Sequence, residues 1–137
     1  MSDYDQEVEK IRAYNQPILD EFQSWLEKSG LAPKTVKNHV ENIDFFTEYL
    51  VYYEPLSKLD DADGGDVQGF LGSWFPRKAM WASKSSMRSN MASFRKFFRF
   101  LQESGRIDDE VEDDVRETLK ERKDRFLEAV ELDDTYW

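Results

Sequence analysis

Residues 83–103 read SKSSMRSNMASFRKFFRFLQE, and this stretch decides the fold. Its apolar residues recur at steps of three and four positions, which is the spacing of one face of an α-helix. They are Met87, Met91, Phe94, Phe98 and Leu101. Ser83 can accept hydrogen bonds from the first amides of such a helix, and Gly105 supplies a stop after its last apolar residue. The pattern predicts a helix over about residues 84–103 with one buried face.

The same helix carries a row of cations beside its apolar face. At about 100° per residue, four basic side chains fall within roughly 60° of one another. We call these four residues the basic ridge: Lys84, Arg88, Arg95 and Arg99. A charged helix face usually serves only solubility, so a solvated surface and a binding surface are both open interpretations.

The chain has a net charge of −10, which at face value argues against a polyanionic partner. The charge is unevenly distributed, however. Residues 77–106 contain eight basic residues and one acid, whereas residues 107–137 contain thirteen acids and five bases. Because a phosphate backbone is recognised by a local patch, the acidic total weakens a DNA-binding hypothesis without removing it.

Length and composition limit the class of protein. With 137 residues, 39% of them hydrophobic, the chain is expected to form one core. It has no cysteine, which excludes disulfides and thiolate chemistry, and no apolar run that indicates a signal peptide or a membrane span. We expect a cytoplasmic protein with no cofactor, no metal, no membrane partner and no small-molecule substrate.

Helical spacing of apolar residues continues on both sides of residues 83–103, which predicts an all-α protein. An interruption is expected near residue 15, because Pro17 is unfavourable inside a helix. The predicted helices cover about residues 4–14, 16–29, 33–53, 67–75 and 108–132. The last is acidic and has a thin apolar stripe, which indicates either a seam against the core or a docking helix for a partner.

Two stretches resemble the core-binding, SAM-like domain of tyrosine recombinases and phage integrases. Residues 30–50, GLAPKTVKNHVENIDFFTEYL, look like the opening of that domain, with matches at Thr35, His39, Ile43, Phe46 and Leu50. Residues 83–101 are similar to its fourth helix, with matches at Ser86, Met91, Phe94, Arg95, Phe97 and Phe98. The family usually has a tyrosine where this chain has His39.

The resemblance covers about residues 16–107 and implies a small orthogonal helical bundle. On this basis residues 1–107 are expected to form a core-binding-like domain, and residues 108–137 an additional acidic helix and tail. The family grips duplex DNA with its second and fourth helices. Carried over by position, the resemblance implies DNA contacts from Lys34, Thr35, Lys37 and Asn38, and from Lys84, Ser86, Arg88, Arg95 and Arg99.

The resemblance does not extend to the catalytic domain of a tyrosine recombinase. Beyond Arg106 the sequence has no histidine, and its only phenol, Tyr136, stands beside two aspartates that offer no activating cation. His39 is the single histidine and falls on an apolar face, so we predict that it is a packed core residue. The chain is therefore expected to have no catalytic residues and to bind DNA without cutting it.

A competing hypothesis is a non-catalytic interaction module that has lost DNA binding. In that case the acidic helix binds a basic partner or a second copy of the chain. Under the DNA-binding hypothesis the partner is duplex DNA, and a full-length recombinase or a second copy of the chain are further possible partners. The position of the acidic helix separates the two hypotheses, because a helix that covers the basic ridge turns its cations into internal ion pairs.

Overall fold

The computed structural model describes residues 2–135, with side chains to Glu131, and these residues contain helices and no β-strand. The predicted all-α class is confirmed. The helices group into two compact units, residues 1–62 and residues 63–137. The prediction made for Tyr136 concerns a position outside the described residues.

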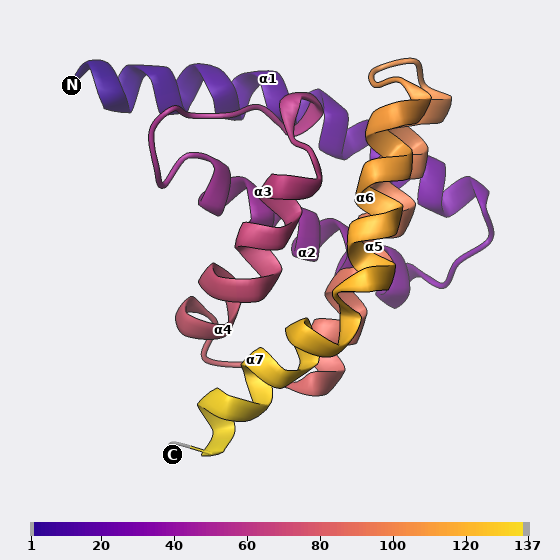
Figure 1. The fold of residues 1–137 in the computed structure, drawn as a ribbon. Coiled ribbons are helices and arrows are strands. Elements are labelled where there is room, and N and C mark those ends of the chain that lie inside the picture. The colour runs from indigo at the N-terminus through magenta and orange to yellow at the C-terminus, as the bar shows by residue number, and fades with distance from the viewer. Residues whose placement is uncertain (1, 136–137) are drawn as a thin grey trace. The chain divides into compact units, whose positions relative to one another are not determined.

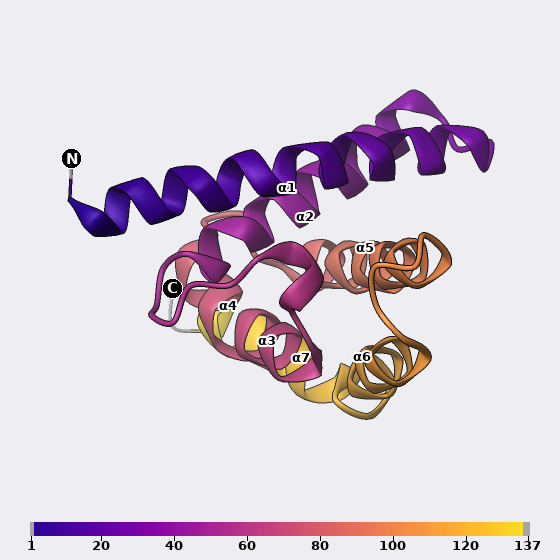
Figure 2. The same ribbon diagram turned by 90° about the horizontal axis from the view of Figure 1, so that it is seen from above.

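The first unit is a pair of helices, α1 (Asp3–Lys28) and α2 (Pro33–Leu50), followed by the single turn η1 (Leu59–Asp61). The two helices pack along each other, as Figure 2 shows. Gly30, with φ 87°, takes the left-handed conformation in the loop between them, where a side chain would be strained. The buried Asn15 accepts a hydrogen bond at 3.1 Å from the amide of Leu59, so it fixes the segment after α2 against α1.

The predicted interruption near residue 15 is wrong, because α1 runs through Pro17 without a break. A proline inside a helix costs about 3 kcal/mol. Each large apolar side chain that is buried offsets about 1.5–3 kcal/mol of such a cost, and Ile11, Ile18 and Phe22 continue one buried face on both sides of the proline. Ala13, whose carbonyl loses its helical donor at Pro17, is exposed, so that carbonyl can bind water.

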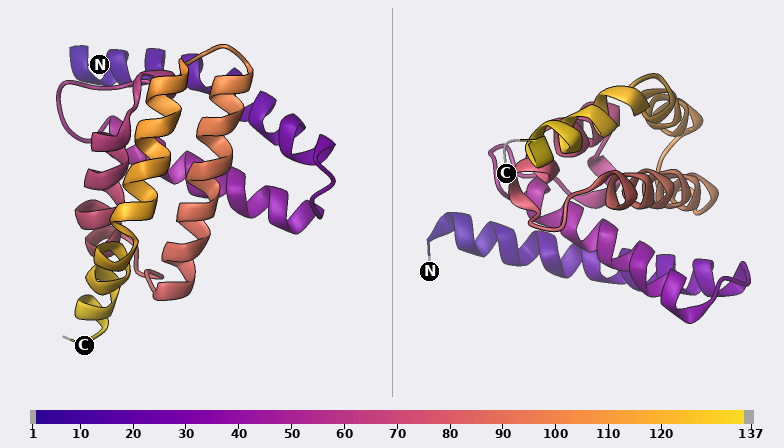
Figure 3. Two further views of the ribbon diagram at one scale, coloured as in Figure 1. Left: turned by 45° about the vertical axis from the view of Figure 1, so that its right-hand side comes forward. Right: turned by 90° about the horizontal axis from the view of Figure 1, so that it is seen from below.

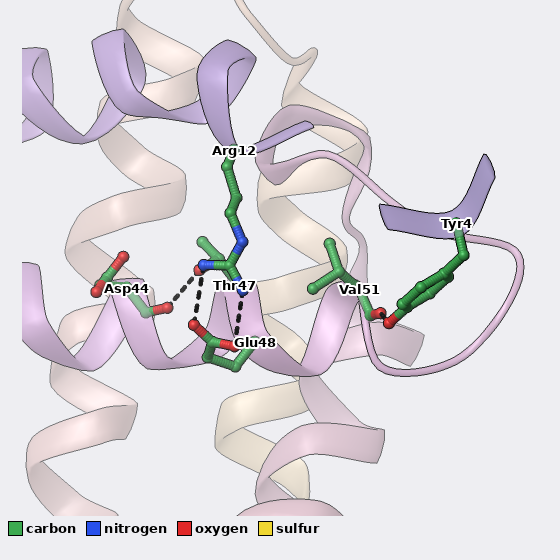
Figure 4. A network of polar contacts seen from close by, with 6 residues as sticks. All are labelled: Tyr4, Arg12, Asp44, Thr47, Glu48 and Val51. Atoms are coloured by element: carbon green, nitrogen blue, oxygen red, sulfur yellow. Dashed lines mark hydrogen bonds and ion pairs between the residues drawn. The ribbon is translucent and has the colours of Figure 1, made fainter. Parts of the chain in front are cut away.

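A polar contact fixes α2 against α1 on the exposed side of the first unit (Figure 4). The guanidinium of Arg12 donates two hydrogen bonds to the Glu48 carboxylate, at 3.1 and 3.0 Å, and this contact raises the pKa of Arg12. Partial burial and the neighbouring Glu48 charge raise the pKa of Asp44, although Arg12 opposes the shift. The Tyr4 hydroxyl adds a hydrogen bond to the carbonyl of Val51, just beyond α2.

The second unit begins with an almost continuous helical segment made of α3 (Gly64–Gly69), the π-helical turn η2 (Phe70–Trp74) and α4 (Phe75–Lys78). The helix predicted to end near residue 75 therefore extends further. The reason is that Pro76 stands in the first turn of α4, where a missing amide donor costs little.

The central helix of this unit is α5 (Lys84–Glu103), at the predicted position. Its inner face is aromatic: the Phe94 ring lies 5.7 Å from Phe70, edge to face, and 6.4 Å from Phe98. All three rings are buried. Gly105, with φ 76°, provides the predicted stop.

The acidic segment forms two helices, α6 (Asp109–Glu121) and α7 (Lys123–Thr135), so the prediction of one long helix is wrong. The chain bends at Arg122, with φ −104° and ψ 8°. The bend lets the two halves pack on different neighbours: α6 lies beside α5 and α3, whereas α7 packs on α5, η2 and α4 (Figures 1 and 3). The Phe126 ring of α7 lies next to Gly72 of η2, at a distance where a Cβ atom would make only an ordinary van der Waals contact.

The acidic helices thus belong to the same compact unit as α5. Their predicted apolar stripe consists of Val111, Val115, Leu119, Phe126 and Val130. The last four are buried, as expected for a seam against the core, whereas Val111 is partly exposed. The domain boundary expected near residue 107 stays a prediction. Among the described residues, no helix combines the length and apolar character needed to cross a bilayer.

Candidate nucleic-acid interface

The N-terminus of α5 is capped by two serines. The Ser83 hydroxyl accepts from the amide of Ser86 at 3.1 Å, and the Ser86 hydroxyl accepts from the amide of Ser83 at 2.8 Å. This reciprocal arrangement satisfies two amides that the first turn would otherwise leave without partners. Ser86 therefore has a structural use, and its predicted contact with DNA stays a prediction.

The side chains of α5 divide the helix into two halves. At about 100° per residue, the buried side chains of Met87, Asn90, Phe94 and Phe100 and their neighbours cover one half of the circumference. All four members of the basic ridge lie on the opposite, exposed half. The apolar packing of α5 thus forces its cations outward.

Three members of the basic ridge carry unneutralised charge. Arg88, Arg95 and Arg99 are exposed, and none of them has an ion-pair partner within residues 2–131. Lys84 differs, because its ammonium group lies 3.0 Å from the Glu131 carboxylate of α7. Both side chains of that pair are about half exposed, at 45% and 59%, so the contact is weak and sensitive to salt.

The acidic helices leave most of the ridge uncovered. α6 packs beside α5. Two of its acids, Glu112 and Asp113, form ion pairs with Arg116 of α6 itself and not with the ridge. The only ridge residue that an acid from α6 or α7 reaches, among the described side chains, is Lys84. In this unit, the described parts of the acidic helices therefore do not turn the ridge cations into internal ion pairs, apart from Lys84.

A second predicted surface lies on α2, in the first unit. Lys34, Thr35 and Asn38 are exposed near the start of the helix, whereas Lys37 forms a 3.8 Å ion pair with Glu41 one turn along. Ala32 precedes the helix and offers no side-chain cap, and the first turn contains no acid. The positive end of the helix dipole is thus compensated neither by a side-chain cap nor by an acid in the first turn of α2.

His39 is buried in α2, with 7% of its surface exposed, which agrees with the predicted core position. Within the described residues, no group of three or more histidine, aspartate or glutamate side chains is placed to hold a metal ion.

Two exposed apolar residues had no role in the sequence interpretation. Met80 and Trp81 lie in the loop between α4 and α5, with 99% and 58% of their surfaces exposed. The sequence signal was present, since both follow Arg77 and Lys78 and directly precede the capped helix. Apolar periodicity overlooks them because they belong to a turn.

Comparison with known proteins places this geometry in context. Residues 19–105 match the family model described as phage integrase, N-terminal SAM-like domain. The chain is 29% identical over 91 residues to the tyrosine recombinase XerD of Listeria innocua, which covers 66% of this chain and 30% of that protein. It is 30% identical over 86 residues to the tyrosine recombinase XerC of Myxococcus xanthus, covering 62% of this chain and 27% of that protein. No solved structure matches the chain.

Proposed function

This chain belongs to the family of phage integrase N-terminal SAM-like domains, and on that premise we propose that it binds duplex DNA through the basic ridge of α5 without cutting it. The observation that carries the proposal is the exposure of Arg88, Arg95 and Arg99 in one row, without acidic partners among the described side chains. In a protein with a net charge of −10, an uncompensated cationic row calls for an anionic ligand.

The dimensions of the row suit a phosphate backbone. Eleven residues separate Arg88 from Arg99, which is about 16 Å along a helix with a rise of about 1.5 Å per residue. Successive phosphates of one strand advance by about 3.4 Å along the duplex axis, so the row spans about five of them. Guanidinium groups also form paired hydrogen bonds with phosphate oxygens, which makes arginine the better residue for this role.

The polar start of α2, in the first unit, is a second surface that we propose contacts DNA. Lys34, Thr35 and Asn38 offer an ammonium, a hydroxyl and an amide beside an uncapped helix N-terminus, and such groups contact phosphates and base edges. Lys37 can also contact a phosphate, because its 3.8 Å pair with Glu41 is highly exposed and therefore weak.

Strand cleavage is not part of the proposed function. The chain spans less than a third of the recombinases it matches, so their activity is not carried over to it. Association with a full-length recombinase or with a second copy, and a cytoplasmic location, stay predictions. The interaction-module hypothesis is less favoured, because four apolar side chains of the acidic helices, Val115, Leu119, Phe126 and Val130, are buried in their own unit.

The test is a titration of a labelled duplex of unrelated sequence at several salt concentrations. If three ridge arginines each neutralise one phosphate, log affinity should fall with log salt at a slope of about −2.7, or about −3.6 with Lys84 included. The Arg88→Ala/Arg95→Ala variant should weaken binding and reduce the slope by about 1.8.

The matched control removes two exposed cations from the acidic helices instead, in the variant Lys120→Ala/Arg125→Ala. It changes the net charge by the same amount, so an equal loss in both variants would mean that only net charge matters. If the unaltered chain did not bind duplex DNA even at low salt, the proposal would be overturned and the interaction-module hypothesis would be favoured instead.

A further inference from the structure

The loop between α4 and α5 presents two apolar side chains at its tip. The amide of Ala82 donates to the carbonyl of Ala79 at 3.1 Å, which closes a four-residue turn with Met80 and Trp81 at its two corners. Corner positions of turns favour glycine, proline, asparagine, aspartate and serine. A methionine with 99% of its surface exposed, beside a half-exposed indole, needs a reason other than turn geometry.

The tip is held at both ends. On the α4 side, Ala79 is buried and its amide donates to the carbonyl of Phe75 at 3.0 Å. On the α5 side, the Ser86 hydroxyl donates to the carbonyl of Trp81 at 3.2 Å. The Phe75 ring also meets the indole edge to face, with centroids 6.4 Å apart. The backbone of the turn is thus anchored, while most of the indole faces solvent.

The surroundings of the tip are cationic. Arg77 and Lys78 precede it and Lys84 and Arg88 follow it, all with exposed side chains. No acid occurs from residue 77 to residue 102. A partner of this surface needs negative charge to meet the cations and a flat apolar surface to meet Met80 and Trp81. DNA offers both, in its phosphate backbone and in the faces of its bases.

We infer that the Met80–Trp81 turn is a wedge that contacts unstacked bases, with the Trp81 indole stacked on a base and Met80 beside it. This inference rests on the proposed DNA-binding function and names a second kind of contact for the same surface. The ridge supplies attraction to phosphates without regard to sequence, whereas the wedge favours base steps that open easily.

An anionic membrane surface has related chemistry, but the layout favours DNA. The exposed cations continue from the tip in one row along α5 to Arg99, as suits a linear backbone. Two apolar side chains also form a small anchor, whereas surface-bound helices bury a whole apolar face in the lipid. The buried half of α5 leaves no such face to offer.

The experiment follows intrinsic tryptophan emission of the full chain during titration with duplex DNA. In the unaltered chain, stacking on a base should quench part of the emission, and the Trp81→Phe variant should lose that part. The Trp81→Ala variant should bind about tenfold more weakly at fixed salt with the salt slope unchanged, because no phosphate contact is lost. Met80→Ala should weaken binding by a smaller factor, and its full exposure removes folding as an explanation.

The control is Tyr53→Ala, which removes an aromatic side chain of 50% exposure from the first unit. The wedge would be overturned if Trp81→Ala bound DNA as strongly as the unaltered chain and Trp81→Phe showed the same quenching as the unaltered chain. Salt-dependent binding in that case would leave the proposed function intact. A lack of any DNA binding would overturn both. Binding to phosphatidylserine vesicles with a Trp81-dependent emission shift, and no quenching by DNA, would replace the wedge with a lipid contact.

Discussion

The exposed face of α5 and the exposed faces of α6 and α7 belong to one compact unit but differ in charge. α5 and α6 are amphipathic, and all three helices bury apolar side chains in a shared core. The outer face of α5 carries the basic ridge, whereas most of the acids of α6 and α7 whose side chains are described lie on the exposed faces of those two helices.

The difference shows that net charge describes only part of this surface. Acids on α6 pair with Arg116 of the same helix, and Glu131 is the only described acid that forms an ion pair with a ridge residue. If charge served solubility alone, the opposite charges would have no reason to be segregated. Segregation instead keeps one face attractive to an anion while the total charge stays far from zero.

The largest expected effect comes from the core on which both faces depend. Phe94→Ala removes a buried ring that contacts Phe70 and Phe98, and the cavity left behind should lower the free energy of unfolding by about 3–5 kcal/mol. Urea denaturation followed by circular dichroism measures this. Arg95→Ala, on the exposed half of the same helix, should change it by less than about 0.5 kcal/mol, and an equal loss in both variants would contradict the division of α5 into two halves.

A smaller effect, on DNA affinity, is expected at the Lys84–Glu131 ion pair, where the basic face of α5 meets the acidic face of α7. Glu131→Gln breaks the ion pair with Lys84, so duplex affinity at low salt should rise about two- to threefold and the salt slope should steepen by about 0.9. Stability should change by less than about 1 kcal/mol, as for other exposed pairs. Glu128→Gln makes the same change of charge at an exposed position of α7, and an equal gain there would rule out a specific contact.

The smallest expected effect is a pH-dependent change in stability at the start of α3, whose cap can ionise, whereas the cap of α5 cannot. α5 begins with a capping box of two serines, whereas α3 begins with one made of Asp63 and Asp66. Burial, followed by the Asp63 charge, raises the pKa of Asp66, although its hydrogen bond with the Asp63 backbone opposes the shift. The folded state therefore favours protonated Asp66, and this contribution to stability is lost as the pH rises through the raised pKa.

Asp66→Asn keeps a side-chain acceptor but cannot ionise. Its Tm should be slightly higher than that of the unaltered chain at pH 7, and the difference should vanish below about pH 4, the ordinary aspartate pKa. Thermal unfolding at a series of pH values measures this. A difference that does not depend on pH would show that the ionisation of Asp66 has no part in stability.

Much of the fold and of the candidate site could be predicted from the sequence, because the signals involved are local. The caps at Ser83 and Gly105 set the ends of α5, and its apolar spacing placed the ridge on the outer face. The family resemblance at residues 30–50 and 83–101 agrees with the match over residues 19–105. The wrong predictions concern Pro17 and Arg122, where burial of side chains elsewhere in the same unit overrides the local preference.

The sequence by itself determined that this protein is all-α, that α5 is two-sided and that positive charge gathers on its outer side, because helical periodicity and capping act within a few residues. Packing between distant segments determines the rest: the described side chains of α6 and α7 form no ion pair with Arg88, Arg95 or Arg99, Lys84 meets Glu131, and Met80 and Trp81 project from a closed turn. The reason is physical: what covers a surface depends on how distant segments pack, and no local pattern contains that information.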